Sequence, residues 1–300
     1  MIYADHAATT KISETAKLAM LSAMEKDWYN PSSLYTPGQQ ASGTLMDARV
    51  RIAHCLGCLP KEIYFTSGGS EADNQAILSA AAIGKRQGKM HIISTAFEHH
   101  AVLHTLKKLE KEGFEITLLD VGEKGIVSPV QVEKAIRPDT ALVTVMYANN
   151  EIGTIQPIRE IGAVCRQNGV LFHTDAVQAA GHLPINVKDD QIDMLSLSAH
   201  KFNGPKGIGV LYAKIGVFLT NLIEGGGQER GKRAGTENLP AIVGMAAALE
   251  EALAFQNERL VYVTQLRNQL IAGLNNIPDA ILNGDEKSRL PGNVNFCFKG

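Results

Sequence analysis

Residues 193–207, DMLSLSAHKFNGPKG, carry the signal from which the fold and the site of this chain can be argued. The apolar run DMLSLS reads as a buried strand, and Lys201 follows where the strand runs out, next to the turn residues Asn-Gly-Pro and a further Gly. A solubilising lysine needs no such setting. A nucleophilic lysine does, because a strand end is rigid and the loop beyond it gives a ligand access.

Six other apolar runs alternate with helical patterns along the chain. Most of them are continuous, as expected for strands that are covered on both faces. Ser128-Pro129 followed by Gln131 predicts a capped helix start, and Pro157 predicts another. Strands that alternate with helices predict an α/β domain with a mostly parallel, seven-stranded sheet flanked by helices. The six runs are EIYFTS (62–67), MHIIST (90–95), EITLLDV (115–121), ALVTVMYA (141–148), VLFHTD (170–175) and GIGVLYA (207–213).

The composition is that of an ordinary globular protein, with 300 residues, 45% of them hydrophobic and 20% charged. A formal net charge of -2 gives no electrostatic reason to expect nucleic acid or an anionic membrane as a partner. No run approaches the roughly 18 apolar residues of a membrane span, and the N-terminus lacks the features of a signal peptide. We therefore expect a cytoplasmic protein.

The pattern of apolar and polar residues changes after about residue 240, where strongly helical patterns are followed by a final strand-like run. This change predicts a large domain over residues 13–245. A smaller α/β domain is predicted from residues 1–12 together with residues 246–300.

The four cysteines give only weak support for a zinc or redox site. Cys55 and Cys58 form a CLGC pair, but no second cysteine or histidine pair stands nearby, so we interpret them as small apolar residues at a helix end. Cys165 borders an apolar helix face and is expected in the core. Cys297 lies inside the last strand-like run and is expected to be an inert core thiol.

Polar groups follow the ends of several predicted strands. FTSGGSEADN (65–74) is a strand, a small-residue turn and a helix start, which can cradle a phosphate or be a plain turn. Asp175 follows another strand, either as a helix N-cap or as the partner of a protonated ring nitrogen. His99 and His100 could suggest a metal, but adjacent residues rarely converge on one ion and no acidic or cysteine ligand set accompanies them. An imidazole stacked on a flat cofactor is the alternative, and no metal site is predicted.

The glycine-rich, basic stretch GGGQERGKRAGTEN (225–238) reads either as a mobile surface loop or as a set of phosphate or subunit contacts. Each of these stretches alone favours an ordinary structural interpretation. Together they gather after the strands of one α/β sheet, where such sheets bind ligands. A phosphate cradle, a ring-facing imidazole, a carboxylate for a pyridinium nitrogen and a Schiff-base lysine describe a site for pyridoxal 5'-phosphate.

The sequence also resembles a known family over essentially all of its length. The similar motifs are DHAATT, FTSGGSEADN, EHHAVL, NNEIGTIQPI, HTDAVQAAGHLPI, SAHKFNGPKGIGVLY and GGGQERGKRAGTEN. They resemble the cysteine desulfurases of the nitrogen-fixation and iron–sulfur-cluster type, in the class V aminotransferase superfamily. The resemblance implies the large-domain, small-domain fold of type I pyridoxal-phosphate enzymes.

The resemblance further implies a role for each matching residue. Lys201 would form the Schiff base and His99 would stack on the ring and assist proton transfer. Asp175 would keep the ring nitrogen protonated, Gln178 would contact the phenolic oxygen, and Asn150 would lie near the cofactor and the substrate carboxylate. The phosphate cradle would be Gly69, Ser70, Ser198 and His200, with Thr236 reaching in from the other subunit of a homodimer.

In this family, L-cysteine is converted to L-alanine, and its sulfur is left as a persulfide on a mobile-loop cysteine. The sulfur then passes to an acceptor such as an iron–sulfur scaffold or a tRNA-modifying protein. The family's cysteine loop lies beyond the strand that NVNFCFKG resembles, and an arginine for the substrate carboxylate lies later still. Because the chain stops at Gly300, we expect a small domain that is incomplete at the C-terminus and a chain that alone is inactive in sulfur transfer.

Two classes of function stay open on this basis. The first is a cysteine desulfurase, with a selenocysteine lyase or another class V lyase as the alternative enzyme. The second is a dimeric scaffold that binds the cofactor without catalysis.

Overall fold

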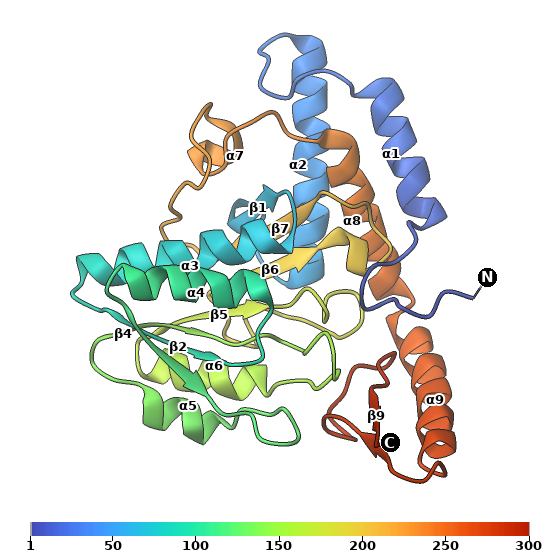
Figure 1. Ribbon diagram of the computed structural model, residues 1–300. Coiled ribbons are helices and arrows are strands. Elements are labelled where there is room, and N and C mark those ends of the chain that lie inside the picture. Colours follow the sequence, from blue (N-terminus) through green and yellow to red (C-terminus); the bar gives the residue numbers. More distant parts are fainter. Residues whose placement is uncertain (1, 300) are drawn as a thin grey trace.

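The computed structural model describes residues 2–299, so Met1 and Gly300, which belong to the predicted small-domain segments, lie outside the described residues. All seven strands predicted for the large domain are present. They are β1 (Ile63–Thr66), β2 (His91–Thr95), β3 (Glu115–Leu119), β4 (Thr140–Thr144), β5 (Leu171–Asp175), β6 (Met194–Ser198) and β7 (Gly209–Ala213). They form one sheet in the order β1-β7-β6-β5-β4-β2-β3 (Figure 1). Strand β7 runs antiparallel to β1 and β6, and the other neighbours are parallel, as expected for a mostly parallel sheet.

The helices of the chain cover both faces of this sheet and also extend beyond it. They are α1 (Glu14–Lys26), α2 (Thr36–Leu56), α3 (Gly69–Arg86), α4 (His100–Lys111), α5 (Pro129–Ala135), α6 (Ile158–Gln167), α7 (Gln228–Gly231), α8 (Leu239–Ala254) and α9 (Gln256–Leu274), with short 3-10 turns η1 (Pro60–Glu62) and η2 (Ala199–Lys201). Helices α3 and α4 lie together on one side of the sheet, and α5 and α6 lie on the other (Figure 1).

Alternate strand residues enter two separate cores. Ile92 and Leu142 pack with α3 and α4, whereas their neighbours Ile93 and Val143 pack in the larger core, which also contains side chains of α2, α6 and α8. All four side chains are fully buried. The continuous apolar runs of the sequence are explained by this arrangement, because side chains on both faces of each strand leave water.

The predicted helix starts are also present. Ser128 caps α5 in a capping box with Gln131, and Pro157 is the N-cap of α6. A capping box satisfies two backbone N–H groups that would otherwise lack a partner, so its residues define where the helix begins.

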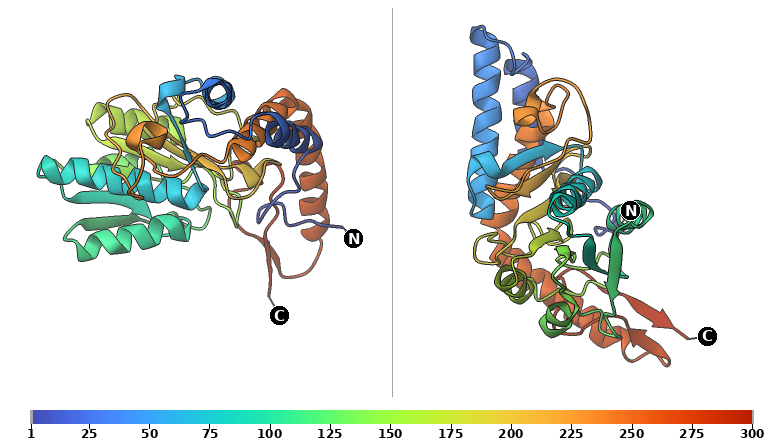
Figure 2. Two further views of the ribbon diagram at one scale, coloured as in Figure 1. Left: turned by 90° about the horizontal axis from the view of Figure 1, so that it is seen from above. Right: turned by 90° about the vertical axis from the view of Figure 1, so that its left-hand side faces the viewer.

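The last part of the chain forms a separate layer beside the sheet. Helices α8 and α9 meet at an angle of 69°, and the strands β8 (Ala280–Leu282) and β9 (Phe296–Phe298) form a small antiparallel sheet near α9 (Figure 2). The predicted domain boundary at residue 245 falls within α8, whose buried side chains belong to the larger core. Within residues 2–299 no single helix is long and apolar enough to cross a membrane, although the bent pair α8 and α9 reaches that length and composition together.

Cys297 corrects one expectation from the sequence. It lies in a strand, as expected, but its side chain is exposed and does not belong to a core. The reason is that β9 pairs with a single neighbour, β8, and the two strands are not covered as the central sheet is. Cys165, by contrast, is fully buried in the larger core, as expected.

Candidate functional site

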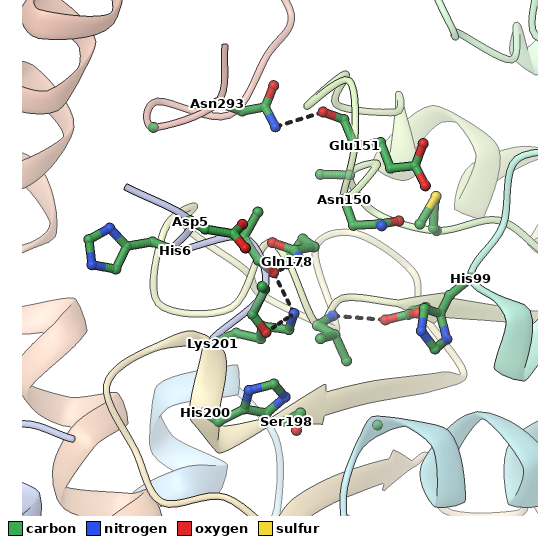
Figure 3. Close-up of a pocket in the computed structure, with 18 of the residues that line it drawn as sticks. Asp5, His6, His99, Asn150, Glu151, Gln178, Ser198, His200, Lys201 and Asn293 are labelled. Atoms are coloured by element: carbon green, nitrogen blue, oxygen red, sulfur yellow. Dashed lines mark hydrogen bonds between the residues drawn. The ribbon is translucent and has the colours of Figure 1, made fainter. Parts of the chain in front are cut away.

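A cavity of about 710 Å³ opens at the end of the sheet where the parallel strands finish (Figure 3). Segments that follow five different strands line it, together with residues 4–8 near the N-terminus and residues 292–295 near β9. Nine of the ten residues predicted for the site lie in its wall. These nine are Gly69, Ser70, His99, Asn150, Asp175, Gln178, Ser198, His200 and Lys201.

Lys201 ends the 3-10 turn η2, directly after β6, as expected from the sequence. Its Nζ atom donates hydrogen bonds to the carbonyl oxygens of Ala7 and Ala8 (Figure 3). Burial lowers the pKa of Lys201, and the negative charges of Asp175 and Asp5 oppose this effect. A lowered pKa increases the fraction of free amine, which is the form that attacks a carbonyl carbon.

Asp175 is the last residue of β5 and is 5% exposed. One carboxylate oxygen accepts a hydrogen bond from the backbone N–H of Val177 over 2.9 Å. A turn follows rather than a helix, so the N-cap interpretation of Asp175 is wrong. Burial raises the pKa of Asp175, whereas the Val177 N–H and the charges of His99 and Lys201 lower it. Among the described residues no lysine or arginine forms an ion pair with this carboxylate.

His99 is the N-cap of α4, and its Nδ1 accepts a hydrogen bond from the N–H of Ala101 over 3.1 Å. The ring is exposed at the cavity wall, where it can contact a flat ligand. From the sequence, no set of acidic ligands was expected beside His99 and His100. That expectation is wrong, because two carboxylates lie near His99 in the structure. A carboxylate oxygen of Asp73, a ring nitrogen of His99 and a carboxylate oxygen of Asp175 all lie within 4.8 Å of one another. Helix α3 and strand β5 bring these residues together although they are far apart in sequence.

The turn between β1 and α3 has the shape of an anion cradle. Gly68 has φ of 156°, which favours glycine, and α3 begins at Gly69 with its backbone N–H groups free at the helix N-terminus. A Cβ on Gly69 would lie 2.6 Å from a methyl group of Val177, so the close approach of α3 to the segment after Asp175 requires glycine. Ser198 and His200 line the same region, and a second cavity of about 460 Å³ adjoins it.

These groups fit pyridoxal phosphate on the chemistry of the donors. A helix N-terminus, hydroxyl groups and an imidazole suit a phosphate dianion. In the same cavity, the buried carboxylate of Asp175 has no lysine or arginine partner among the described residues and suits a protonated pyridine nitrogen. The amine of Lys201 also lines the cavity and suits an aldehyde.

Thr236 is the one predicted residue that lies outside the main cavity. It is exposed and lines a smaller hollow together with Ser67 and Gly207. From this position Thr236 does not line the main cavity of its own subunit. The prediction that Thr236 serves the other subunit of a homodimer is compatible with it.

The glycine-rich loop is tied to the large domain by buried charges. Glu229 forms a two-pronged ion pair with Arg49, at 2.6 and 2.8 Å, and accepts a hydrogen bond from the N–H of Phe65. Arg233 pairs with Glu71 at 2.9 Å, and Arg230 packs on the ring of Tyr64. These contacts anchor the loop to the rest of the chain, and both arginines make contacts within the chain.

Several groups at the site were missed by sequence reasoning. The carbonyl oxygen of Ala7 also accepts from Gln178, over 2.9 Å, although residues 1–12 had been assigned to the small domain. Asp73 and Glu98 are buried acids near Asp175, and burial raises the pKa of Glu98 to about 8. Asp73 belongs to the quoted motif FTSGGSEADN, but a single sequence does not show that the helix turns this side chain toward the cavity.

None of the four cysteines, all of which lie in the described part of the chain, lines the main cavity. Burial raises the pKa of Cys55 to about 11 and those of Cys58 and Cys165 to about 12. These three thiols are therefore protonated at neutral pH and poor nucleophiles.

Comparison with known proteins gives a consistent result. The family model of the class-V aminotransferases matches residues 2–300. The chain is 51% identical to the cysteine desulfurase IscS of Clostridium botulinum over 302 residues, which cover all of this chain and 76% of that protein. It is 50% identical to the cysteine desulfurase IscS of Methanosarcina thermophila over 298 residues, which cover 99% of this chain and 74% of that protein.

Solved structures are similar as well. A NifS-like protein superposes with a TM-score of 0.93 at 38% identity, covering 97% of this chain and 80% of that one. The structure of SspA in complex with cysteine superposes with a TM-score of 0.88 at 39% identity, covering all of this chain and 84% of that one.

Proposed function

The chain belongs to the class V aminotransferase family, among the cysteine desulfurases of the IscS and NifS type, and on that premise we propose that it binds pyridoxal phosphate and acts on L-cysteine. Its fold is that of the type I pyridoxal-phosphate enzymes. The observation that carries the proposal is that Lys201, Asp175 and the Gly69 turn all line one cavity, so that the amine, the buried carboxylate and the phosphate cradle face the same space.

When bound, pyridoxal phosphate supplies an electron sink for the carbanion that forms at the α-carbon of an amino acid. The residues of this chain position the reactants around it. Ser70, Ser198 and His200 hold the phosphate, Gln178 and Asn150 provide polar contacts at the rim, and His99 covers one face of the ring. Asp175 keeps a proton on the ring nitrogen, and the Nζ atom of Lys201 carries a proton to or from the α-carbon.

We assign the overall reaction as conversion of L-cysteine to L-alanine, with the sulfur handed to an acceptor protein for iron–sulfur cluster or thio-cofactor synthesis. Among the described residues, the groups proposed to hold the cofactor lie together in the lining of the cavity. Within the described residues no cysteine lines the cavity, so a second candidate, a dimeric protein that binds the cofactor without transferring sulfur, is kept beside the first.

A spectroscopic titration followed by product analysis tests the proposal. We expect pyridoxal phosphate to give the shifted absorption band of an imine with the wild-type chain, and only the absorption of the aldehyde with Lys201→Ala. L-Cysteine should change the band and L-selenocysteine should be compared at the same concentration, because faster turnover of selenocysteine would indicate a selenocysteine lyase. Failure of the wild-type chain to bind pyridoxal phosphate would contradict the proposal.

A further inference from the structure

A second buried carboxyl group lies behind Asp175. Asp73, in the second turn of α3, is 1% exposed and forms part of the floor of the main cavity. Its side chain and those of Asp175 and His99 have ligand atoms within 4.8 Å of one another. Two buried acids therefore share one pocket.

Among residues 2–299, no lysine or arginine forms an ion pair with Asp73 that could balance a second anion. The nearest cationic candidate is His173, whose Nε2 lies 3.7 Å from Oδ1 of Asp73, too far for a hydrogen bond. Oδ1 of Asp73 has no hydrogen-bond partner. The ring nitrogens of His173 are paired with Ser196 at 3.0 Å and Thr144 at 2.8 Å.

His173 is also neutral at physiological pH, because burial lowers its pKa to about 3. Glu98, the other titratable group near the pair, has a pKa raised to about 8 by burial and is itself largely protonated at pH 7. His99 and Lys201, the remaining candidates for positive charge, act on Asp175. Two carboxylates in such a pocket cannot both be ionised without a large cost in free energy.

The two acids differ in what favours their charged forms. Asp175 accepts a backbone N–H bond from Val177 and lies near His99 and Lys201. Burial raises the pKa of Asp73 well above its usual value and the charge of Asp175 raises it further, whereas the hydroxyl of Ser196 lowers it in part. The proton therefore belongs on Asp73.

We propose that Asp73 is a positioning residue that stays protonated beside an ionised Asp175, supplies an O–H donor on the buried side of that carboxylate, and so leaves one negative charge to face the ring nitrogen of the cofactor. The part that concerns the cofactor rests on the proposed function. The protonation of Asp73 does not, since it follows from the groups of the chain itself. Asparagine at position 73 should replace the neutral acid well, because its amide is also uncharged and donates a hydrogen bond.

Infrared spectroscopy of the cofactor-free protein at pH 7 tests whether the carboxyl group of Asp73 is protonated. The carbonyl stretch of a protonated carboxylic acid should be present in the wild-type protein, lose intensity in Asp73→Asn, and keep the Asp73 contribution in the matched control Glu98→Gln. Absence of any contribution that depends on Asp73 would overturn the proposal.

The effect on the cofactor is measured with pyridoxal phosphate labelled with ¹⁵N in the ring. The wild-type protein and Asp73→Asn should give the same protonated-ring chemical shift. Asp73→Leu, which removes the donor, should move the shift toward that of neutral pyridine and weaken cofactor binding about ten-fold, as expected for one lost hydrogen bond to a charged group. A shift in Asp73→Asn equal to that in Asp73→Leu would overturn the proposal.

The two parts of the experiment separate the possible failures. If Asp73→Leu does not fold, Asp73→Asn and the infrared spectra still decide the question. If the wild-type protein does not bind pyridoxal phosphate, the proposed function fails, while the infrared spectra still show whether Asp73 carries a proton.

Discussion

The side-chain amine of Lys201 lies 2.9 Å from the carbonyl oxygen of Ala8, although the two residues are 193 positions apart in the chain. The amine also donates to the carbonyl oxygen of Ala7. The N-terminal segment thus closes one side of the cavity and holds the lysine at its wall before any ligand binds. This position suits an amine that must reach an aldehyde without first changing its rotamer.

Replacement of Lys201 by alanine should abolish covalent attachment of pyridoxal phosphate and leave weaker, non-covalent binding through the phosphate cradle and Asp175. Borohydride reduction and peptide mapping of the wild-type protein should find the pyridoxyl group on Lys201. Lys206→Ala is the matched control, because Lys206 lines the adjoining cavity and should not affect the attachment. A modified Lys206 or Lys214 in the wild-type protein would contradict the assignment.

The free energy of unfolding should depend on pH through His173. Its pKa is about 3 when folded, below the usual value of about 6.5, so between these values the unfolded chain binds the proton and the folded chain does not. Stability from this group is complete above pH 6.5 and falls as the pH drops, by up to about 1.4 kcal/mol per pH unit. Denaturation of the cofactor-free protein at pH 7 and pH 5 should therefore show a smaller loss in His173→Gln than in the wild type.

Glu98 provides a control, because its effect on the free energy of unfolding changes with pH in the opposite direction to that of His173. Its folded pKa of about 8 lies above the usual 4.5, so the folded chain binds the proton more tightly and stability decreases as the pH rises between these values. Glu98→Gln should remove this decrease. Equal pH dependence in the wild type and in both variants would show that neither group is buried as described.

Strand positions were predictable from the sequence because a strand covered on both faces leaves a continuous apolar run, as in Ile92 and Ile93. The polar residues at the strand ends were predictable for a related reason, since parallel strands end at one edge of a sheet. The exposure of Cys297 was not predictable, because a strand-like run does not indicate how many neighbours will cover it. The placement of Asp73 and the burial of Glu229 were missed as well, because both depend on contacts between residues far apart in the chain.

The buried pair of Arg49 and Glu229 should be important for stability, since both side chains are at most 4% exposed. Glu229→Gln leaves the guanidinium of Arg49 without a counter-charge and should lower the free energy of unfolding by about 3–5 kcal/mol. The exposed pair of Lys17 and Glu14 is the matched control, and Glu14→Gln should change stability by at most about 0.5 kcal/mol. Urea denaturation measures both, and equal effects would contradict the structural role of Glu229.

Thr236 should act across a homodimer. Thr236→Ala and Lys201→Ala would each impair both sites of a homodimer, but a mixed dimer of the two would regain one intact site if Thr236 serves the partner subunit. Mixing the two variants after partial unfolding should therefore restore cofactor attachment in part. No restoration, with mixed dimers shown by light scattering and mass spectrometry, would place Thr236 on its own subunit's site.

Sulfur transfer requires a thiolate that can reach the substrate sulfur, and the positions of the four cysteines bear on this directly. Cys55, Cys58 and Cys165 have pKa values raised by burial and lie outside the cavity wall. Cys297 is exposed on β9, only two residues after the segment 292–295 that lines the cavity, and is the one thiol that a movement of this strand could bring closer.

We expect the 300-residue chain to bind pyridoxal phosphate and to release no sulfide catalytically from L-cysteine in the presence of a reductant. The groups proposed to bind the cofactor, from Gly69 to Thr236, are all present, whereas within the described part of the chain no thiol lines the cavity. Absorption spectroscopy measures binding, and sulfide and alanine assays measure turnover, with Cys165→Ala as the control for a buried cysteine. Sustained sulfide release that Cys297→Ala abolishes and Cys165→Ala leaves intact would contradict the expectation, and would identify the β9 thiol as the sulfur acceptor.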